Sequence, residues 1–192
     1  MKFKIGPLES ESPVPPDNDW TLMKKVSICE FQIRAIPIGI ITAVLIGILW
    51  TFVMPTSAFI REIRFPSTII TFTLCLLGTL IIHELIHYLF HPLNKDRNDS
   101  VIGFWPSKMF LYAQYKGEMT RGRSCIILAM PFIIISVVPL LVSIYLMRTA
   151  YWIAYTSIVN AYLSCGDLFM IIWSLRELPS GSIMKLNWWK LK

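Results

Sequence analysis

Four apolar runs constrain this chain more than any other feature of its sequence. They cover residues 36–54, 67–90, 124–147 and 151–175, and a helix needs roughly 20 residues to cross a bilayer. The chain of 192 residues is 55 % hydrophobic and only 16 % charged, whereas soluble domains have about 25 % charged residues. We therefore expect an all-α integral membrane protein with four transmembrane helices.

The distribution of positive charge predicts how such a protein is oriented. The first 35 residues are polar and predict a tail, followed by a membrane domain over residues 36–192. With four spans, this tail, the loop 91–123 and the C-terminal end share one side and hold 15 Lys and Arg residues, against 3 on the other side. The positive-inside rule then places both termini in the cytoplasm and the protein in the cell membrane. No basic run or zinc-finger spacing accompanies the net charge of +6, so nucleic acid is not expected as a partner.

The long loop 91–123 contains one candidate for regular structure outside the helices. Residues 110–120 could form a β-hairpin that turns at Lys116-Gly117, and a solvated loop fits the same residues nearly as well.

The second apolar run contains the motif His83-Glu84-Leu85-Ile86-His87, an HExxH sequence. On a helix, residues i and i+4 lie on one face, so His83 and His87 can ligate one metal ion. Glu84 lies about 100° around the helix, which suits an acid that touches a metal-bound water without ligating the metal. An unpaired Glu in such an apolar run would cost several kcal/mol (about 2–7). We therefore predict a zinc site on His83 and His87, with Glu84 as the general base.

A catalytic zinc ion commonly has three protein ligands, so one more is expected. Asp167 is the only acid of the fourth run, and it lies on a polar stripe with Asn160 and Ser164. It follows the start of its run by as many residues as His83 follows the start of the second, which predicts a similar depth in the bilayer. Cys165 and His91 remain as alternative third ligands, although Pro92 argues that the helix ends before His91.

These residues resemble a known family. HELIH in an apolar helix, then Tyr112-Ala113, Ala129-Met130-Pro131 and Gly166-Asp167, resembles the bacterial membrane family described as "putative zincin peptidase", and more distantly the site-2 proteases. The resemblance covers residues 70–185. It implies Zn²⁺ held by His83, His87 and Asp167, Glu84 as catalytic base, and cleavage within the membrane.

The leading hypothesis is therefore a zinc-dependent membrane peptidase that cleaves a membrane or membrane-associated protein. Asn160 would hold the substrate backbone, and the hairpin at residues 110–120 would add the unwound substrate as an extra strand. The alternative is a metal-binding membrane regulator or adaptor without catalysis. A metal or proton transporter is the weakest hypothesis, because few polar residues in the third run match the stripe at Asn160.

Overall fold

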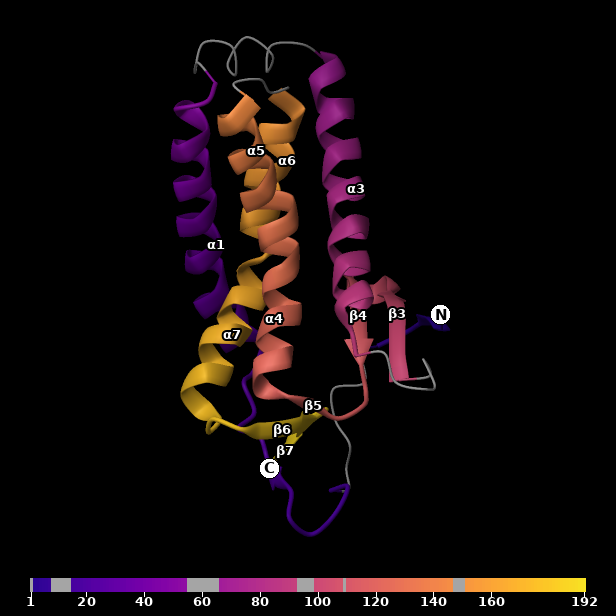
Figure 1. Cartoon of the computed structure of the whole chain (residues 1–192). Coiled ribbons are helices and arrows are strands. Elements are labelled where there is room, and N and C mark those ends of the chain that lie inside the picture. Colours follow the sequence, from indigo (N-terminus) through magenta and orange to yellow (C-terminus); the bar gives the residue numbers. More distant parts are fainter. Residues whose placement is uncertain (1, 8–14, 55–65, 93–98, 109, 147–150) are drawn as a thin grey trace.

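The chain folds into a helix bundle with two small sheets at one end (Figure 1). The computed structural model describes residues 2–7, 15–54, 66–92, 99–108, 110–146 and 151–192. The helices are α1 (Ile28–Thr51), α3 (Pro66–Phe90), α4 (Arg121–Pro131), a π-helical turn (Phe132–Val137), α5 (Val138–Leu146), α6 (Tyr151–Leu163) and α7 (Cys165–Glu177). The strands are β1 (Lys2–Ile5), β2 (Thr21–Leu22), β3 (Ser100–Trp105), β4 (Phe110–Tyr115), β5 (Met119–Thr120), β6 (Ser182–Lys185) and β7 (Trp188–Leu191).

Three helical segments are long and apolar enough to cross a membrane. They are Cys29–Thr51, Ile69–Phe90 and Arg121–Leu146, and only 22 %, 17 % and 28 % of their respective apolar stretches are buried inside the protein. An apolar surface of this extent is unfavourable in water and suits contact with lipid. The helix α1 begins eight residues before the predicted start of the first span, while the second span agrees closely with its prediction.

The fourth predicted span is broken. α6 and α7 meet at Ser164 and are bent relative to each other by 43°, so they count as one span only if the bent pair crosses together. A break leaves helix carbonyls without their usual donors. At this break the carbonyl oxygen of Ala161 accepts from the hydroxyl of Thr42 on α1 at 2.9 Å. The carbonyl oxygen of Asn160 keeps its backbone donor, the N–H of Ser164, and also accepts from the hydroxyl of Ser164, each at 2.9 Å.

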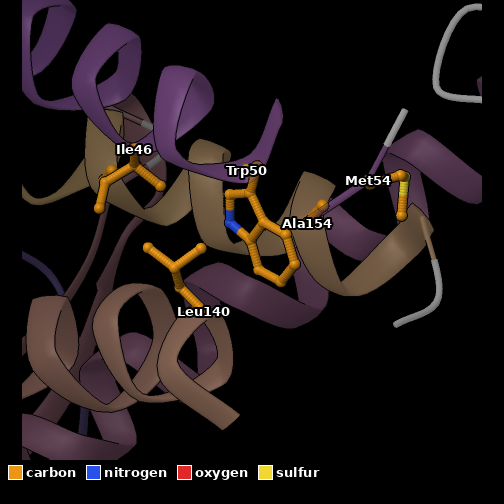
Figure 2. Packing of buried hydrophobic residues seen from close by; sticks show 6 residues of the cluster. Ile46, Trp50, Met54, Leu140 and Ala154 are labelled. Carbon is orange, nitrogen blue, oxygen red and sulfur yellow. The ribbon is translucent and has the colours of Figure 1, made fainter. Parts of the chain in front are cut away.

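The core of the bundle lies where α1, α5 and α6 meet. Figure 2 shows Trp50 between Ile46, Leu140 and Ala154. The indole of Trp50 is almost fully buried, and its N–H donates to Oγ of Ser157 at 2.9 Å. A large aromatic side chain thus fills the space between the helices while its one polar group is satisfied.

The sheets correct the predicted hairpin. β4 does pair with a neighbouring strand of the loop, but that strand is β3 on its N-terminal side, in an antiparallel register from Ser100↔Tyr115 to Trp105↔Phe110. Residues after Lys116-Gly117 do not return along β4, because β5 pairs instead with the C-terminal strand β6. The predicted turn at Lys116-Gly117 is therefore wrong, and the hairpin of the loop lies one strand earlier.

The polar tail is also more ordered than the sequence predicts. β1 lies parallel to β3, and β2 pairs with β7 at the C-terminal end. The sheets and both ends of the chain consequently lie at the same end of the bundle (Figure 1). This arrangement agrees with three segments on one side of the bilayer, and the assignment of that side to the cytoplasm stays a prediction from charge.

Candidate metal centre

Helix α3 places both histidines of the HExxH motif on one buried face. His83 and His87 are one helical turn apart, their ring centroids are 4.9 Å apart, and both side chains are almost fully buried. The other faces of α3 carry exposed apolar residues such as Ile82 and Leu85. The two imidazoles therefore point into the protein while the rest of the helix surface suits lipid.

Asp167 lies in the first turn of α7, directly after the break in the fourth run. Its Oδ2 is 2.9 Å from Nε2 of His83 and 3.3 Å from Nε2 of His87. Within the described residues, these three side chains form a group whose possible ligand atoms all lie within 4.8 Å of one another. The equal spacing of His83 and Asp167 from the starts of their runs is thus matched by their contact in the bundle.

The hydrogen bonds of His87 test whether this group fits a metal ion. Its Nδ1 lies 3.0 Å from the carbonyl oxygen of Ile127, and because a carbonyl only accepts, Nδ1 carries the proton. Neutral His87 then presents the lone pair of Nε2 to a carboxylate oxygen of Asp167, which is repulsive unless a cation or proton lies between them. Tetrahedral zinc ligands about 2.1 Å from the ion are about 3.4 Å apart, so nitrogen and oxygen donors at these separations fit Zn²⁺.

Glu84 lies beside this group and outside it. Its Oε2 accepts a hydrogen bond from the backbone N–H of Ala113 on β4 at 2.7 Å. The bond fixes one carboxylate oxygen against the strand and leaves the other for a further proton or water. This position agrees with the separation of Glu84 from the ligand face that helical geometry predicts.

All of these side chains line one cavity of about 620 Å³. The strand β4 and the start of β5 form one wall, and α4, α7 and the C-terminal hairpin form the others. Most of the lining is apolar, including Phe31, Met119, Leu128, Met170 and Met184. An apolar cavity with a few convergent polar groups is the usual form of a binding site.

The two alternative third ligands line the cavity but do not join the group of possible ligands. His91 follows the last residue of α3, and its Nδ1 lies 3.2 Å from Oγ of Ser100. Burial, together with the nearby His87 and Arg123, lowers the pKa of His91 to about 4. The geometry therefore favours Asp167 over Cys165 and His91 as the third ligand.

Asn160 occupies a different place from the one its predicted role requires. It is fully buried, and its carboxamide contacts protein on both sides: Oδ1 is 2.9 Å from Nδ1 of His83, and Nδ2 donates to the carbonyl oxygen of Pro131 at 3.0 Å and to Oγ of Ser136 at 2.9 Å. No polar atom of this side chain is left for a substrate backbone. The structure therefore does not support the predicted substrate contact.

Sequence reasoning missed the backbone groups of the site. The carbonyl of Ile127 and the N–H of Ala113 contact His87 and Glu84, and such contacts have no side-chain signature. Ser136 was visible only as a polar residue within the third apolar run.

Comparison with known proteins agrees with this geometry. The model of a family described as "putative zincin peptidase" matches residues 76–183, more than half of the chain. The match includes His83, Glu84, His87 and Asp167, and α1 lies outside it. Searches of curated proteins and of solved structures find no match. The chain belongs to the family described as putative zincin peptidases.

Proposed function

We propose that this protein is a zinc-dependent membrane peptidase that hydrolyses a peptide bond of a membrane or membrane-associated protein. The observation that carries the proposal is Glu84, an acid that lines the same cavity as His83, His87 and Asp167 but lies outside their group. A protein that only binds a metal has no need of such an acid. The family supports the same class of chemistry.

His83, His87 and Asp167 would hold the ion. Zinc bound there supplies a Lewis acid that polarises a carbonyl and makes water easier to deprotonate. The structure supports these three residues as ligands through the distances between their donor atoms.

Glu84 then performs the proton transfers. Its free carboxylate oxygen takes a proton from the attacking water as the water oxygen bonds to the scissile carbonyl carbon. When the C–N bond breaks, Glu84 gives that proton to the leaving amine, so a peptide and water become a carboxylic acid and an amine. The hydrogen bond from Ala113 holds the carboxylate in place during both transfers.

The strand β4 offers a way to hold the substrate in an extended form. The N–H of Ala113 points to Glu84, and the N–H and C=O of one strand residue point to the same side. The carbonyl of Ala113 therefore also faces away from β3, along an edge that lines the cavity. An unwound substrate segment can add to this edge as a strand, which exposes the peptide bond that a helix would shield.

The test compares Glu84→Gln with wild type in detergent. Both proteins are analysed for bound zinc and incubated with solubilised membrane proteins, and new N-termini are detected by mass spectrometry. We expect both to bind one zinc ion, and we expect Glu84→Gln to cleave about 10²–10⁴-fold more slowly. The matched control is Glu177→Gln, which changes an exposed acid at the end of α7.

Two outcomes would contradict the proposal. If Glu84→Gln cleaves as fast as wild type, Glu84 is not the base. If wild type binds zinc but produces no new N-termini, the chain is a metal-binding regulator or adaptor and the peptidase hypothesis is wrong.

A further inference from the structure

A buried polar network leads from the core of the bundle to the ligand His83. Ser136, Ser157 and Asn160 are fully buried in segments whose surroundings are otherwise apolar. Buried polar groups in a membrane protein are costly unless each has a partner. Here each has one, and the partners form a continuous chain of hydrogen bonds from Trp50 to His83.

The network depends on the π-helical turn Phe132–Val137. This turn lies between Pro131 and Val138, and it places Ser136 opposite Ser157 of α6. Each of these serines donates its hydroxyl to the backbone carbonyl of the other at 2.8 Å. π-Helical turns are rare and are frequently found at functional sites.

The two hydrogen bonds between Ser136 and Ser157 fix the direction of the other hydrogen bonds in the network. Ser136 donates its single hydroxyl proton to the carbonyl oxygen of Ser157. Its Oγ can therefore only accept a hydrogen bond from Asn160. The carbonyl of Pro131 likewise only accepts. The NH₂ group of Asn160 must therefore face α4 and the π-helical turn, and its Oδ1 must face His83.

This orientation decides the protonation of His83. An amide oxygen only accepts a hydrogen bond, so Nδ1 of His83, 2.9 Å away, must carry a proton. Nε2 is then the nitrogen available to a metal ion, beside Oδ2 of Asp167. In His87, Nδ1 donates instead to the backbone carbonyl of Ile127, which no side-chain substitution removes.

We propose that Asn160 and Ser136 are positioning residues, which hold His83 with a proton on Nδ1 so that Nε2 is presented to the metal. The proposal deepens the metal site of the proposed function and rests on it. Hydrogen-bond partners of this kind orient metal-binding histidines, and their loss typically weakens metal binding about 10–100-fold.

The test uses the fact that the chain has 3 histidines. Protein labelled with ¹⁵N at histidine is studied metal-free by NMR at mildly alkaline pH, where the nitrogen shifts and couplings report which ring atom is protonated. We expect a proton on Nδ1 of His83 in wild type. In Asn160→Leu the acceptor is lost, and we expect the proton on Nε2, where Asp167 accepts it.

Zinc affinity is measured on the same proteins by competition with a chromophoric chelator. The Kd should rise about 10–100-fold in Asn160→Leu and less in Ser136→Ala, where the carbonyl of Pro131 still holds the amide. Asn160→Asp retains an acceptor and should restore the proton to Nδ1. Ser143→Ala, which removes a buried hydroxyl in α5 outside the network, should match wild type.

The proposal is overturned if Asn160→Leu keeps the proton on Nδ1 or leaves the Kd unchanged. If Asn160→Leu does not fold, Ser136→Ala decides, and an unchanged Kd there overturns the proposal. A wild type that has the Nδ1 proton but binds no zinc refutes the proposed metal site alone, because the NMR result does not depend on metal.

Discussion

Gly39 holds α1 against the break between α6 and α7, and adding one methyl group there should disturb the site. A Cβ at Gly39 would lie 2.8 Å from Cβ of Cys165 and 2.9 Å from the carbonyl oxygen of Tyr162. Neither atom is at the end of a flexible side chain, so in Gly39→Ala the helices must separate. Thr42, one turn further along α1, would then lose its hydrogen bond to Ala161.

The expected loss of stability in Gly39→Ala follows from a comparison with Gly47→Ala. The methyl group at Gly47 would meet only Cδ1 of Ile158, at 3.9 Å, which is ordinary contact. Both substitutions gain the same helix propensity, so this gain cancels in the difference between them. Overpacking costs about 1–3 kcal/mol, and a lost interhelical hydrogen bond in a membrane protein costs about 0.6 kcal/mol. We expect Gly39→Ala to be less stable than Gly47→Ala by about 2–3 kcal/mol.

The assay is equilibrium unfolding in mixed detergent micelles, together with zinc affinity. A difference of about 2–3 kcal/mol is a change of roughly 30- to 150-fold in the unfolding constant. Because Asp167 follows the break by three residues, the zinc Kd should rise in Gly39→Ala and not in Gly47→Ala. Equal stability of the two variants would refute the reasoning, since it would mean that α1 does not pack tightly on the break.

Two further predictions concern groups that are not candidate ligands. The pKa of His91 is lowered to about 4. As the pH falls below 6.5, the unfolded chain therefore takes up a proton on this residue and the folded protein does not. The free energy of unfolding should consequently fall between pH 6.5 and pH 4, by at most about 3 kcal/mol. His91→Phe should reduce this fall in unfolding measured against pH, and an identical profile would contradict the lowered pKa. Trp50→Ala should cost about 3–5 kcal/mol in the same unfolding assay, because it empties the core beside Leu140. Trp50→Phe keeps most of the side-chain volume but loses the donor to Ser157, so it should cost less than Trp50→Ala. Equal losses in both variants would show that packing is not the cause.

The possible ligands could be predicted from the sequence because charge is so scarce in the apolar runs. Glu84 and Asp167 are the only acids inside the predicted spans, and an intramembrane acid is costly unless it has a partner. Counting residues along two spans then gives the depth of His83 and Asp167, and the structure brings them within 2.9 Å. This part of the site is encoded by local pattern and by helix geometry alone.

Most of the errors concern which segments contact one another. An alternating stretch at 110–115 predicts a strand, but the choice between β3 and a partner after Lys116-Gly117 depends on tertiary packing. The break at Ser164 could not be predicted, because no proline lies near it in the sequence. The carboxamide of Asn160 was assigned to the substrate because nothing in the fourth run alone shows that α3 and the π-helical turn contact both of its sides.

The break between α6 and α7 connects these observations, because Asn160 and Asp167 contact the two nitrogens of one imidazole. Along a straight helix, residues seven apart are about 10 Å apart along the axis and leave the helix in nearly the same direction. The bend of 43° after Leu163 changes the direction of the chain between them, so that both side chains reach His83 from different sides. α1 stabilises this bend through Gly39 and Thr42. α1 therefore supports the arrangement of the candidate metal centre, although it contributes none of the candidate ligands and lies outside the residues that the family model matches.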